Sequence, residues 1–385
     1  MGNSVWRKTA WRGAMGFFVL GLGVVAAVGP VRAQGRNLAP IKVGAISSLA
    51  SGAAFPESAR AVKAYFDVIN AEGGVHGRKL QIISLDDAYD PKKTAANTTK
   101  LISEEGVFAL FGYAGTGSTL AALPIAEKSQ VPLIAPLSGA DVLREKAPRV
   151  LFVMRAGYQD ELARMVEQLV TTGVKDIAIA YQDDGFGKSV LRSAEAVLAK
   201  NGLKAAAVGA IDGKTYDAGK AVAAIAKAHP GAILMGTAGK ASVTFIRDYL
   251  KTGERPQFFG LSVMSAVQLR KELGPESTGI AVAQVVPSPW SSKYPVVKEY
   301  RNALGKDRQQ EAHYNGLEGY IAAKMLVEGL KRAGKDLTRD KLIVALEGMR
   351  NLDLGEYLIN YSAEKHTGST FVDLSIIRSD GQFVQ

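Results

Sequence analysis

Short strand-like runs alternate with helix-like segments along almost the whole chain from residue 41 onwards, and this alternation constrains the fold most strongly. Ile41–Ile46 is the first apolar run. Ala59, Val62, Phe66 and Ile69 then recur at spacings of three and four, which is typical of one apolar helix face. Repeated strand–helix units predict parallel sheets that are covered by helices on both faces.

The same pattern predicts the other elements. Strands are expected at 80–85, 107–111, 133–135, 177–181, 205–211, 232–235, 258–261, 280–286, near 357 and at 371–377. Helices are expected from Asp90-Pro91, at about 118–128, 160–171, 188–200, 218–228 and 242–251, and over most of 295–348. So many strands in 385 residues favour an α/β fold with two similar doubly wound parallel-sheet lobes.

The N-terminal segment has the pattern of a secretory signal peptide. The basic residues Arg7, Lys8 and Arg12 precede an apolar stretch, Ala14–Val28, and the tripeptide Val31–Ala33 ends with a small residue. The alternative is a transmembrane anchor, but the apolar run is shorter than the ~20 residues that a span needs. We therefore expect cleavage after this tripeptide and a periplasmic location.

Composition excludes several classes of function. The formal net charge is +10, and removal of the four basic residues in 1–33 leaves +6, spread without a dense basic run, so no nucleic-acid partner is predicted. Hydrophobic residues at 47% and charged residues at 22% are ordinary for a globular chain. The chain has no cysteine, which excludes disulfides, thiol nucleophiles and Cys-based metal sites. No metal and no cofactor are predicted.

The loops that follow the predicted strands are the candidate ligand site, because ligands of open α/β sheets bind beyond the carboxyl ends of the strands. The loop Gly112–Thr119 combines small residues, hydroxyls and a helix start, which suits a carboxylate; a plain helix cap is the alternative. A second loop, Pro136–Asp141, offers another wall. Tyr158, Tyr181 and Phe186 are candidate aromatic residues on the facing lobe, unless each packs within its own lobe.

Enzyme motifs are incomplete, so the chain is predicted not to be an enzyme. Leu120 stands where a dinucleotide-binding motif needs its third glycine, and Gln182 stands where a phosphate-binding loop needs its first. Asp86-Asp87 and Asp183-Asp184 could act as acid and base, although capping of the next helix is the favoured interpretation. No nucleophile–histidine motif is evident, and a surface position is expected for all four histidines: His76, His229, His313 and His366.

Several segments resemble the periplasmic leucine/isoleucine/valine-binding proteins of ABC importers. The resemblance runs in order along nearly the whole chain after residue 33, through Ile41–Ser48, Ile69–Leu80, Asp86–Pro91, Gly112–Thr119, Ile134–Pro136, Gln182–Gly187 and Leu317–Lys324. It implies two lobes joined by a three-strand hinge, with crossovers near Arg155, Gln284 and His366. Lobe 1 would comprise 34–155 plus 285–363, and lobe 2 would comprise 156–284 plus 364–385.

The resemblance also implies site residues. Thr116 matches a hydroxyl that holds the ligand carboxylate in the family, and Phe186 matches an aromatic residue. Ala238 stands where the family has a tyrosine, and Ser262 where it has the acidic residue that meets the ligand ammonium. The predicted ligand-binding set is Phe55, Tyr113, Ala114, Thr116, Leu137, Ser138, Gly139, Tyr158, Phe186, Ala238 and Ser262.

Two classes of ligand and two functions stay open at this point. The loss of the acid at position 262 disfavours a standard branched-chain amino acid and leaves an organic acid or an amide as alternatives. The family implies a monomer that delivers its ligand to ABC permease subunits. A sensor of the same fold, for an amide or an aromatic acid, is the second functional hypothesis.

Overall fold

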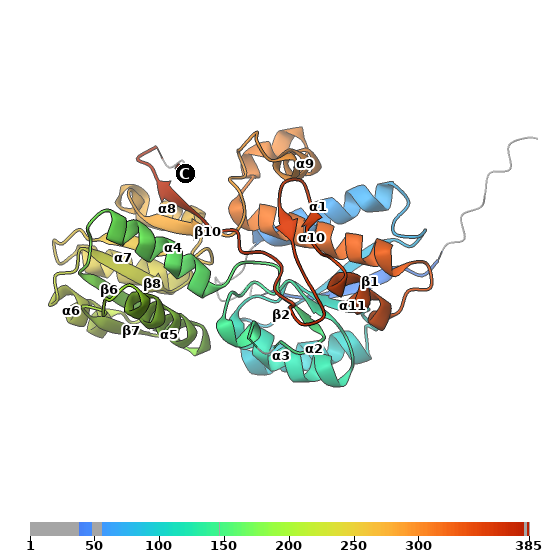
Figure 1. Ribbon diagram of the computed structural model, residues 1–385, viewed down its shortest axis with the longest axis horizontal. Coiled ribbons are helices and arrows are strands. Elements are labelled where there is room, and N and C mark those ends of the chain that lie inside the picture. The colour runs from blue at the N-terminus through green and yellow to red at the C-terminus, as the bar shows by residue number, and fades with distance from the viewer. Residues whose placement is uncertain (1–37, 48–55, 146, 381–382, 385) are drawn as a thin grey trace, which may run out of the picture. The chain divides into compact units, whose positions relative to one another are not determined.

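The computed structural model describes residues 38–47, 56–145, 147–380 and 383–384. The predicted signal peptide and Phe55 lie outside these residues. Figure 1 shows the described chain as an α/β fold in which helices cover two sheets.

The first sheet has five strands, all parallel, in the order β2-β1-β3-β4-β5. They are β1 (Ile41–Ser47), β2 (Leu80–Asp86), β3 (Ala109–Phe111), β4 (Leu133–Ile134) and β5 (Leu151–Phe152). The connecting helices are α1 (Pro56–Ala71), α2 (Pro91–Ser103) and α3 (Thr116–Lys128). Central β3 is buried along its whole length, as the continuous apolar run predicts for a parallel strand that is covered on both faces.

The second sheet has seven strands in the order β14-β13-β10-β9-β8-β6-β7. They are β6 (Ile177–Asp183), β7 (Val208–Asp212), β8 (Ala232–Gly236), β9 (Gln257–Gly260), β10 (Ala281–Gln284), β13 (Asp373–Ile377) and β14 (Phe383–Val384). The strands β6 to β10 pair in parallel. Strand β13 confirms the strand expected at 371–377, but its antiparallel pairing with β10 and the added edge strand β14 are not predicted by the sequence pattern. The helices between β10 and β13 pack on α1 and do not cover this sheet as the crossover helix of a parallel pair would.

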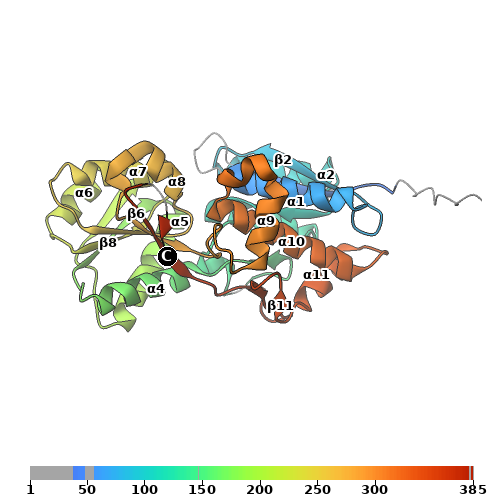
Figure 2. The same ribbon diagram turned by 90° about the horizontal axis from the view of Figure 1, so that it is seen from above.

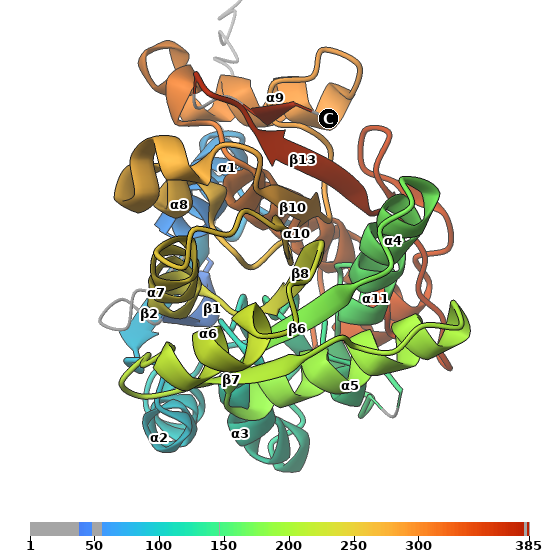
Figure 3. The ribbon, with the colours of Figure 1, turned by 90° about the vertical axis from the view of Figure 1, so that its left-hand side faces the viewer.

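Helices cover both faces of this second sheet, with α4 and α5 on one face and α6, α7 and α8 on the other (Figure 3). They are α4 (Tyr158–Thr171), α5 (Gly185–Lys200), α6 (Gly219–Ala226), α7 (Gly239–Leu250) and α8 (Ala266–Leu273). Successive residues of β6 serve the two faces. Ile177 and Ile179 join the core that contains α4 and α5, whereas Ala178 and Ala180 join the core that contains α6 to α8.

The segment between β10 and β13 is mainly helical, as predicted, and packs on α1 (Figure 2). It contains α9 (Pro295–Leu304), α10 (Tyr314–Ala333), α11 (Arg339–Glu347), β11 (Leu352–Asp353) and β12 (Leu358–Ile359). This segment also contains the 3₁₀ helix η4 (Lys306–Glu311). Two other 3₁₀ helices precede β10: η2 (Asp141–Leu143) and η3 (Gly274–Ser277). The ring of Tyr65 on α1 meets that of Tyr320 on α10 edge-on at 4.9 Å between centroids, which joins this helical layer to the first sheet.

The chain passes between the two sheets three times: after β5, after β10 and before β13. The first and third crossings pair with each other, because Val153 N donates to His366 O at 2.9 Å and Gly368 N donates to Val153 O at 2.8 Å. The second and third crossings meet where β10 pairs with β13, because Gln284 lies opposite Asp373. The three crossings form a hinge whose segments are bonded to one another.

Some boundaries differ from the sequence-based expectations. Helices α3, α4 and α5 begin two or three residues early, at Thr116, Tyr158 and Gly185, because the residues just before them act as N-caps. Strand β5 and helix α8 were not expected at all. One local indication of α8 is Ser265, whose side chain caps the helix by accepting from Gln268 N at 3.2 Å.

In the part of the chain that the structure describes, none of the helices is long and apolar enough to span a membrane. Within the same residues, no three or more histidine, aspartate or glutamate side chains are grouped so that they could hold a metal ion.

Candidate functional site

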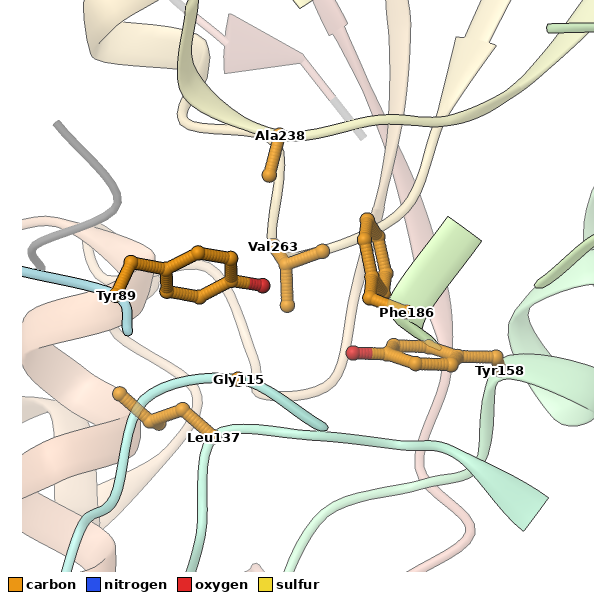
Figure 4. Close-up of a pocket in the computed structure, with 7 residues that line it drawn as sticks. All are labelled: Tyr89, Gly115, Leu137, Tyr158, Phe186, Ala238 and Val263. Carbon is orange, nitrogen blue, oxygen red and sulfur yellow. The ribbon is translucent and has the colours of Figure 1, made fainter. Parts of the chain in front are cut away.

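A small pocket lies between loops that follow strands of the two sheets (Figure 4). It is lined by Tyr89, Gly115 and Leu137 from the first sheet's loops and by Tyr158, Phe186, Ala238 and Val263 from the second sheet's elements. The pocket volume is about 20 Å³. This is roughly the room that one water molecule needs. None of the seven lining side chains carries a formal charge.

Gly115 shapes the floor of the pocket. Its φ of +92° belongs to the left-handed region, and a Cβ at this position would lie 2.5 Å from Cε2 of Tyr89, so only glycine fits. Gly115 is also the N-cap of α3 and has no side chain with which to cap the helix. The N–H groups in the first turn of α3 therefore favour an anion at this end of the pocket.

Buried Asp87 holds the turn that carries Tyr89. Its Oδ1 accepts from Tyr89 N at 2.8 Å, and its Oδ2 accepts from Thr94 Oγ1 at 2.6 Å and from Ser118 Oγ at 2.8 Å. The carboxylate thus joins the β2–α2 turn to the starts of α2 and α3. Its two oxygens are occupied by structural donors, which favours a positioning role over acid–base chemistry.

The second pair of carboxylates is also structural. Asp184 caps α5 by accepting from Gly187 N at 2.9 Å, and Asp183 pairs with Lys188 at 2.7 Å. Asp184 is therefore the helix cap that the sequence favours, whereas Asp183 is held by its ion pair with Lys188. The cap fixes the start of α5, from which Phe186 reaches the pocket.

The aromatic residues face one another across the pocket. Figure 4 shows the hydroxyls of Tyr89 and Tyr158 pointing toward each other, with the ring of Phe186 beside Tyr158. The Tyr158 and Phe186 rings meet edge-on, 5.4 Å apart at an angle of 68°. Burial raises the pKa of both phenols, so they are neutral near pH 7 and can donate or accept a hydrogen bond.

The predicted hydroxyl residues lie behind the pocket wall. Thr116 and Ser138 are fully buried, and their hydroxyls bond to each other at 2.8 Å. Backbone hydrogen bonds also join the loop of Thr116 to the loop of Ser138. Leu137 N donates to Tyr113 O at 2.9 Å, and Gly115 N donates to Leu137 O at 3.3 Å. Thr116 and Ser138 therefore fix the relative position of the two loops, and neither lines the pocket.

The structure places the predicted residues in four groups. Four of them line the pocket: Leu137, Tyr158, Phe186 and Ala238. Four more lie in the loops that carry its wall: Ala114, Thr116, Ser138 and Gly139. The side chains of Tyr113 and Ser262 are buried away from the pocket, and Phe55 lies outside the described residues. The hydroxyl of Tyr113 pairs with Thr98 Oγ1 at 3.1 Å on α2. Tyr181, the third candidate aromatic residue, does not line the pocket. Tyr89 and Val263 line it without having been expected.

Ser262 belongs to a buried ionic group that we call the hinge charge cluster, formed by Arg155, Glu161, Ser262 and Glu318. Ser262 N donates to Glu161 Oε2 at 2.7 Å, and Ser262 Oγ donates to Glu161 Oε1 at 3.0 Å. The Arg155 guanidinium donates to Ser262 Oγ and lies 3.6 Å from a carboxylate oxygen of both Glu161 and Glu318. Ser262 is thus committed to the hinge rather than to the pocket.

Two carboxylates share one guanidinium in this cluster, and all three are at most 4% exposed. Burial raises the pKa of Glu161 to about 7, although Arg155 and the two bonds from Ser262 favour the ionised form. Burial raises the pKa of Glu318 as well. Among the described residues, Arg155 Nε makes no hydrogen bond, so its contact with Glu318 is an ion pair at 3.6 Å.

The histidine expectation is wrong at one position. His366 is 6% exposed, its ring stacks on Phe152 at 4.1 Å, and its Nδ1 lies 3.0 Å from Leu151 O. It is buried because the third crossing runs alongside β5, a pairing that local sequence does not reveal.

Known proteins of similar sequence and fold identify the family. The sequence profile of the periplasmic binding protein family matches residues 40–382. The Leu/Ile/Val-binding protein homolog 7 of Brucella abortus (strain 2308) is 28% identical over 231 residues, which is 57% of this chain and 57% of that protein. The Leu/Ile/Val-binding protein of Escherichia coli (strain K12) is 25% identical over 267 residues, which is 69% of this chain and 71% of that protein.

The fold matches over a larger share. A crystal structure of a possible leucine/isoleucine/valine-binding protein from Rhodopirellula baltica SH 1 superposes with a TM-score of 0.82 at 28% identity, covering 90% of this chain and 96% of that one. The family profile spans most of the chain, and the structure shows two sheets joined by three crossings with a pocket at the strand ends. The chain belongs to the periplasmic binding protein family.

Proposed function

We propose that this protein is the solute-binding component of an ABC importer, acts in the periplasm and carries a small ligand to permease subunits. The observation that carries the proposal is the pocket, whose walls come from loops of both sheets and lie beside three bonded crossings. The lobes would comprise 34–155 plus 285–363 and 156–284 plus 364–385. Residues 1–33 would be the cleaved signal peptide.

Ligand entry requires the pocket walls to separate. A volume of about 20 Å³ is far below the ~300 Å³ at which small-molecule sites begin. Closure of two lobes about a hinge is the general way in which periplasmic binding proteins enclose ligands. The Ser193 hydroxyl on α5 donates a hydrogen bond to Asp141 Oδ2 at 2.6 Å. This bond joins the two walls and would break when they separate.

The pocket favours a ligand that carries a carboxylate or amide and no ammonium. The start of α3 at Gly115 suits the carboxylate, and the two phenols supply further hydrogen bonds. An ammonium would find no carboxylate among the lining residues, and Glu161 is already bonded to Ser262. A charge-assisted bond is worth ~1.5–3 kcal/mol, so its loss weakens a zwitterion roughly tenfold or more. The relatives named for leucine, isoleucine and valine keep the amino acid as the alternative.

Thermal melting of the ligand-stripped protein against a panel of compounds tests both ideas. The panel contains leucine, isoleucine and valine, aliphatic and aromatic carboxylates, and amides. A ligand at ~100 times its Kd adds about 2.7 kcal/mol of stability, which is readily seen. A shift with the amino acids alone would contradict the ligand class but keep the transport role, whereas chemical turnover of a bound compound would contradict the role as a binder.

The loop of α3 is tested by Thr116→Ala. Loss of the bond to Ser138 should loosen the two loops and weaken ligand binding, while the far-UV circular dichroism and the fold stay intact. Thr99→Ala is the matched control, because Thr99 is exposed on α2 and its hydroxyl bonds only to the backbone at Ala95. Equal affinity of the two variants would remove this loop from the site.

A further inference from the structure

A second and larger hollow lies beside helix α8, and we call it the α8 hollow. It is lined by Val267, Arg270, Lys271, Ser288, Trp290, His313 and Phe383. Its volume is about 610 Å³, which is within the range of small-molecule sites. It shares no lining residue with the pocket described above, so an inference about it does not rest on the proposed function.

Aromatic rings form one wall of the α8 hollow. The indole of Trp290 stacks on the ring of Phe383, 5.7 Å apart at an angle of 8°, and meets the Tyr314 ring edge-on at 5.7 Å. Trp290 is nevertheless 39% exposed, and Val267, which also lines the hollow, is 37% exposed. A tightly held indole with one open face is a platform for an apolar or aromatic group.

The lining residues from α8 carry positive charge. Val267, Arg270 and Lys271 are spaced by three and four residues and share one face of α8. Arg270 donates to Gly274 O and to Ser379 O, each at 3.1 Å, and these two carbonyls fix the guanidinium without neutralising it. Basic residues also suit the last turn of a helix, but that role does not account for the aromatic residues that line the same hollow.

His313 supplies a polar atom that protein groups leave unused. Burial lowers the pKa of its imidazole, so the ring is neutral near pH 7. Its Nδ1 is buried and makes no hydrogen bond among the residues that the structure describes. In the tautomer that carries the proton on Nδ1, this atom donates to a carboxylate. The lining contains no acid, and Glu57 lies in an adjoining smaller cavity.

We propose that the α8 hollow is a second ligand site, which binds a small aromatic or apolar carboxylate with its ring on Trp290 and its charge toward Arg270 and Lys271. The carboxylate makes charge-assisted bonds with the guanidinium and the ammonium. The apolar part covers the exposed faces of Trp290 and Val267. A cation of the same shape is repelled by the two basic side chains.

Trp290 is also the natural reporter of this site. The sequence contains three tryptophans, Trp6, Trp11 and Trp290, so Trp6→Phe and Trp11→Phe in the full chain leave one indole. Phenylacetate is the probe, and 2-phenylethanol and phenethylamine are its neutral and cationic counterparts. We expect phenylacetate to change Trp290 fluorescence saturably, 2-phenylethanol to bind at least tenfold more weakly, and phenethylamine to give no saturable change.

Variants locate the binding. Arg270→Gln with Lys271→Gln should weaken phenylacetate at least tenfold, and Lys271→Gln alone, at an exposed position, should weaken it about threefold without touching the fold. Lys220→Gln with Lys227→Gln removes the same charge from exposed positions on and just after α6 and should leave the affinity unchanged.

Three results would overturn the proposal. The first is a phenylacetate response that does not saturate. The second is equal affinity for phenylacetate and 2-phenylethanol. The third is a response that Thr116→Ala weakens and the α8 double variant does not, because phenylacetate would then occupy the pocket between the sheets.

Discussion

The pocket and the hinge charge cluster are neighbours in the chain and opposites in chemistry. Tyr158 lines the pocket three residues after Arg155, and Val263 lines it directly after Ser262. The pocket walls carry no formal charge, whereas the cluster buries one guanidinium and two carboxylates almost completely. The charges that a zwitterionic ligand would need are present nearby, but they are bonded to one another.

Because of this difference, the pocket and the hinge charge cluster have different roles. Glu161 lies on α4, which packs against the second sheet, and Glu318 lies on α10, which packs on α1 beside the first. Arg155 stands in the first crossing between them, so the cluster holds the hinge. The pocket is left to select by shape and by neutral hydrogen bonds. Substitutions in each region separate these two roles.

The largest expected effect is on the cluster. Arg155→Met leaves two buried carboxylates without their shared cation and should lower the free energy of unfolding by about 3–5 kcal/mol, as breaking a buried pair does. Urea-induced unfolding measures this loss. Arg149→Met is the control, because the Arg149 side chain is 53% exposed beside Asp340 and Glu347, and it should cost about 1 kcal/mol or less. Similar losses in both variants would contradict a special role for the cluster.

The second effect is a pH dependence of stability. The pKa of Glu161 is about 7 in the folded chain and 4.5 when unperturbed, so between these values the folded state holds a proton that the unfolded state has released. Stability from this group is therefore complete below about pH 4.5 and is lost as the pH rises toward 7, by at most about 1.4 kcal/mol per pH unit. Glu161→Gln, compared with the unchanged protein by unfolding at several pH values, should remove this slope.

Glu254 gives a control of opposite sign. It is partly buried, and its hydrogen bonds with His229 and Tyr249 lower its pKa, so its stabilisation is present at neutral pH and lost as the pH falls. The difference between the unchanged protein and Glu254→Gln should therefore grow as the pH rises. A difference for Glu161→Gln that grows in the same direction would show that burial does not dominate at Glu161.

The third effect is on the pocket. Gly115→Ala places a Cβ against the Tyr89 ring at a positive φ and should weaken ligand binding about tenfold or more, with a backbone strain of about 1–3 kcal/mol. Gly112→Ala separates the two causes, because Gly112 has φ +65° but no atom within 4 Å of the added Cβ. We expect similar strain in both variants by thermal melting and a loss of affinity by calorimetry only at Gly115. Equal loss of affinity would attribute the effect to strain alone.

The sequence predicts the pocket better than it predicts the cluster. Leu137, Tyr158, Phe186 and Ala238 stand in or beside loops that follow strands, where the rule for open α/β sheets places a ligand. The order of strands and helices indicates the loops of Leu137 and Phe186 and the passage at Tyr158, whereas Ala238 comes from the family resemblance. The resemblance to a known family adds which loops face each other.

The hinge charge cluster cannot be predicted from local sequence patterns, because it depends on contacts between residues that are distant in the sequence. Ser262 is 107 residues from Arg155 and 101 from Glu161, and local pattern reasoning expects charged side chains at the surface. The antiparallel edge formed by β13 and β14 cannot be predicted for the same reason, since strand direction follows from the crossings and not from local propensity. Burial of charge and strand direction are properties of the assembled fold.

The smallest predicted effect distinguishes a phenol that bonds the ligand from one that only shapes the pocket. Tyr89→Phe removes one hydroxyl that points into the pocket and keeps the ring that packs on Gly115 (Figure 4). Loss of a neutral hydrogen bond is worth about 0.5–1.5 kcal/mol, so ligand affinity should fall roughly two- to tenfold in calorimetry. Tyr294→Phe, remote from the lining residues, should change nothing. Unchanged affinity in Tyr89→Phe would assign ligand recognition to the aromatic rings and to the start of α3. The pocket would then differ from the hinge charge cluster even more, because its phenol at position 89 would contribute shape and no hydrogen bond.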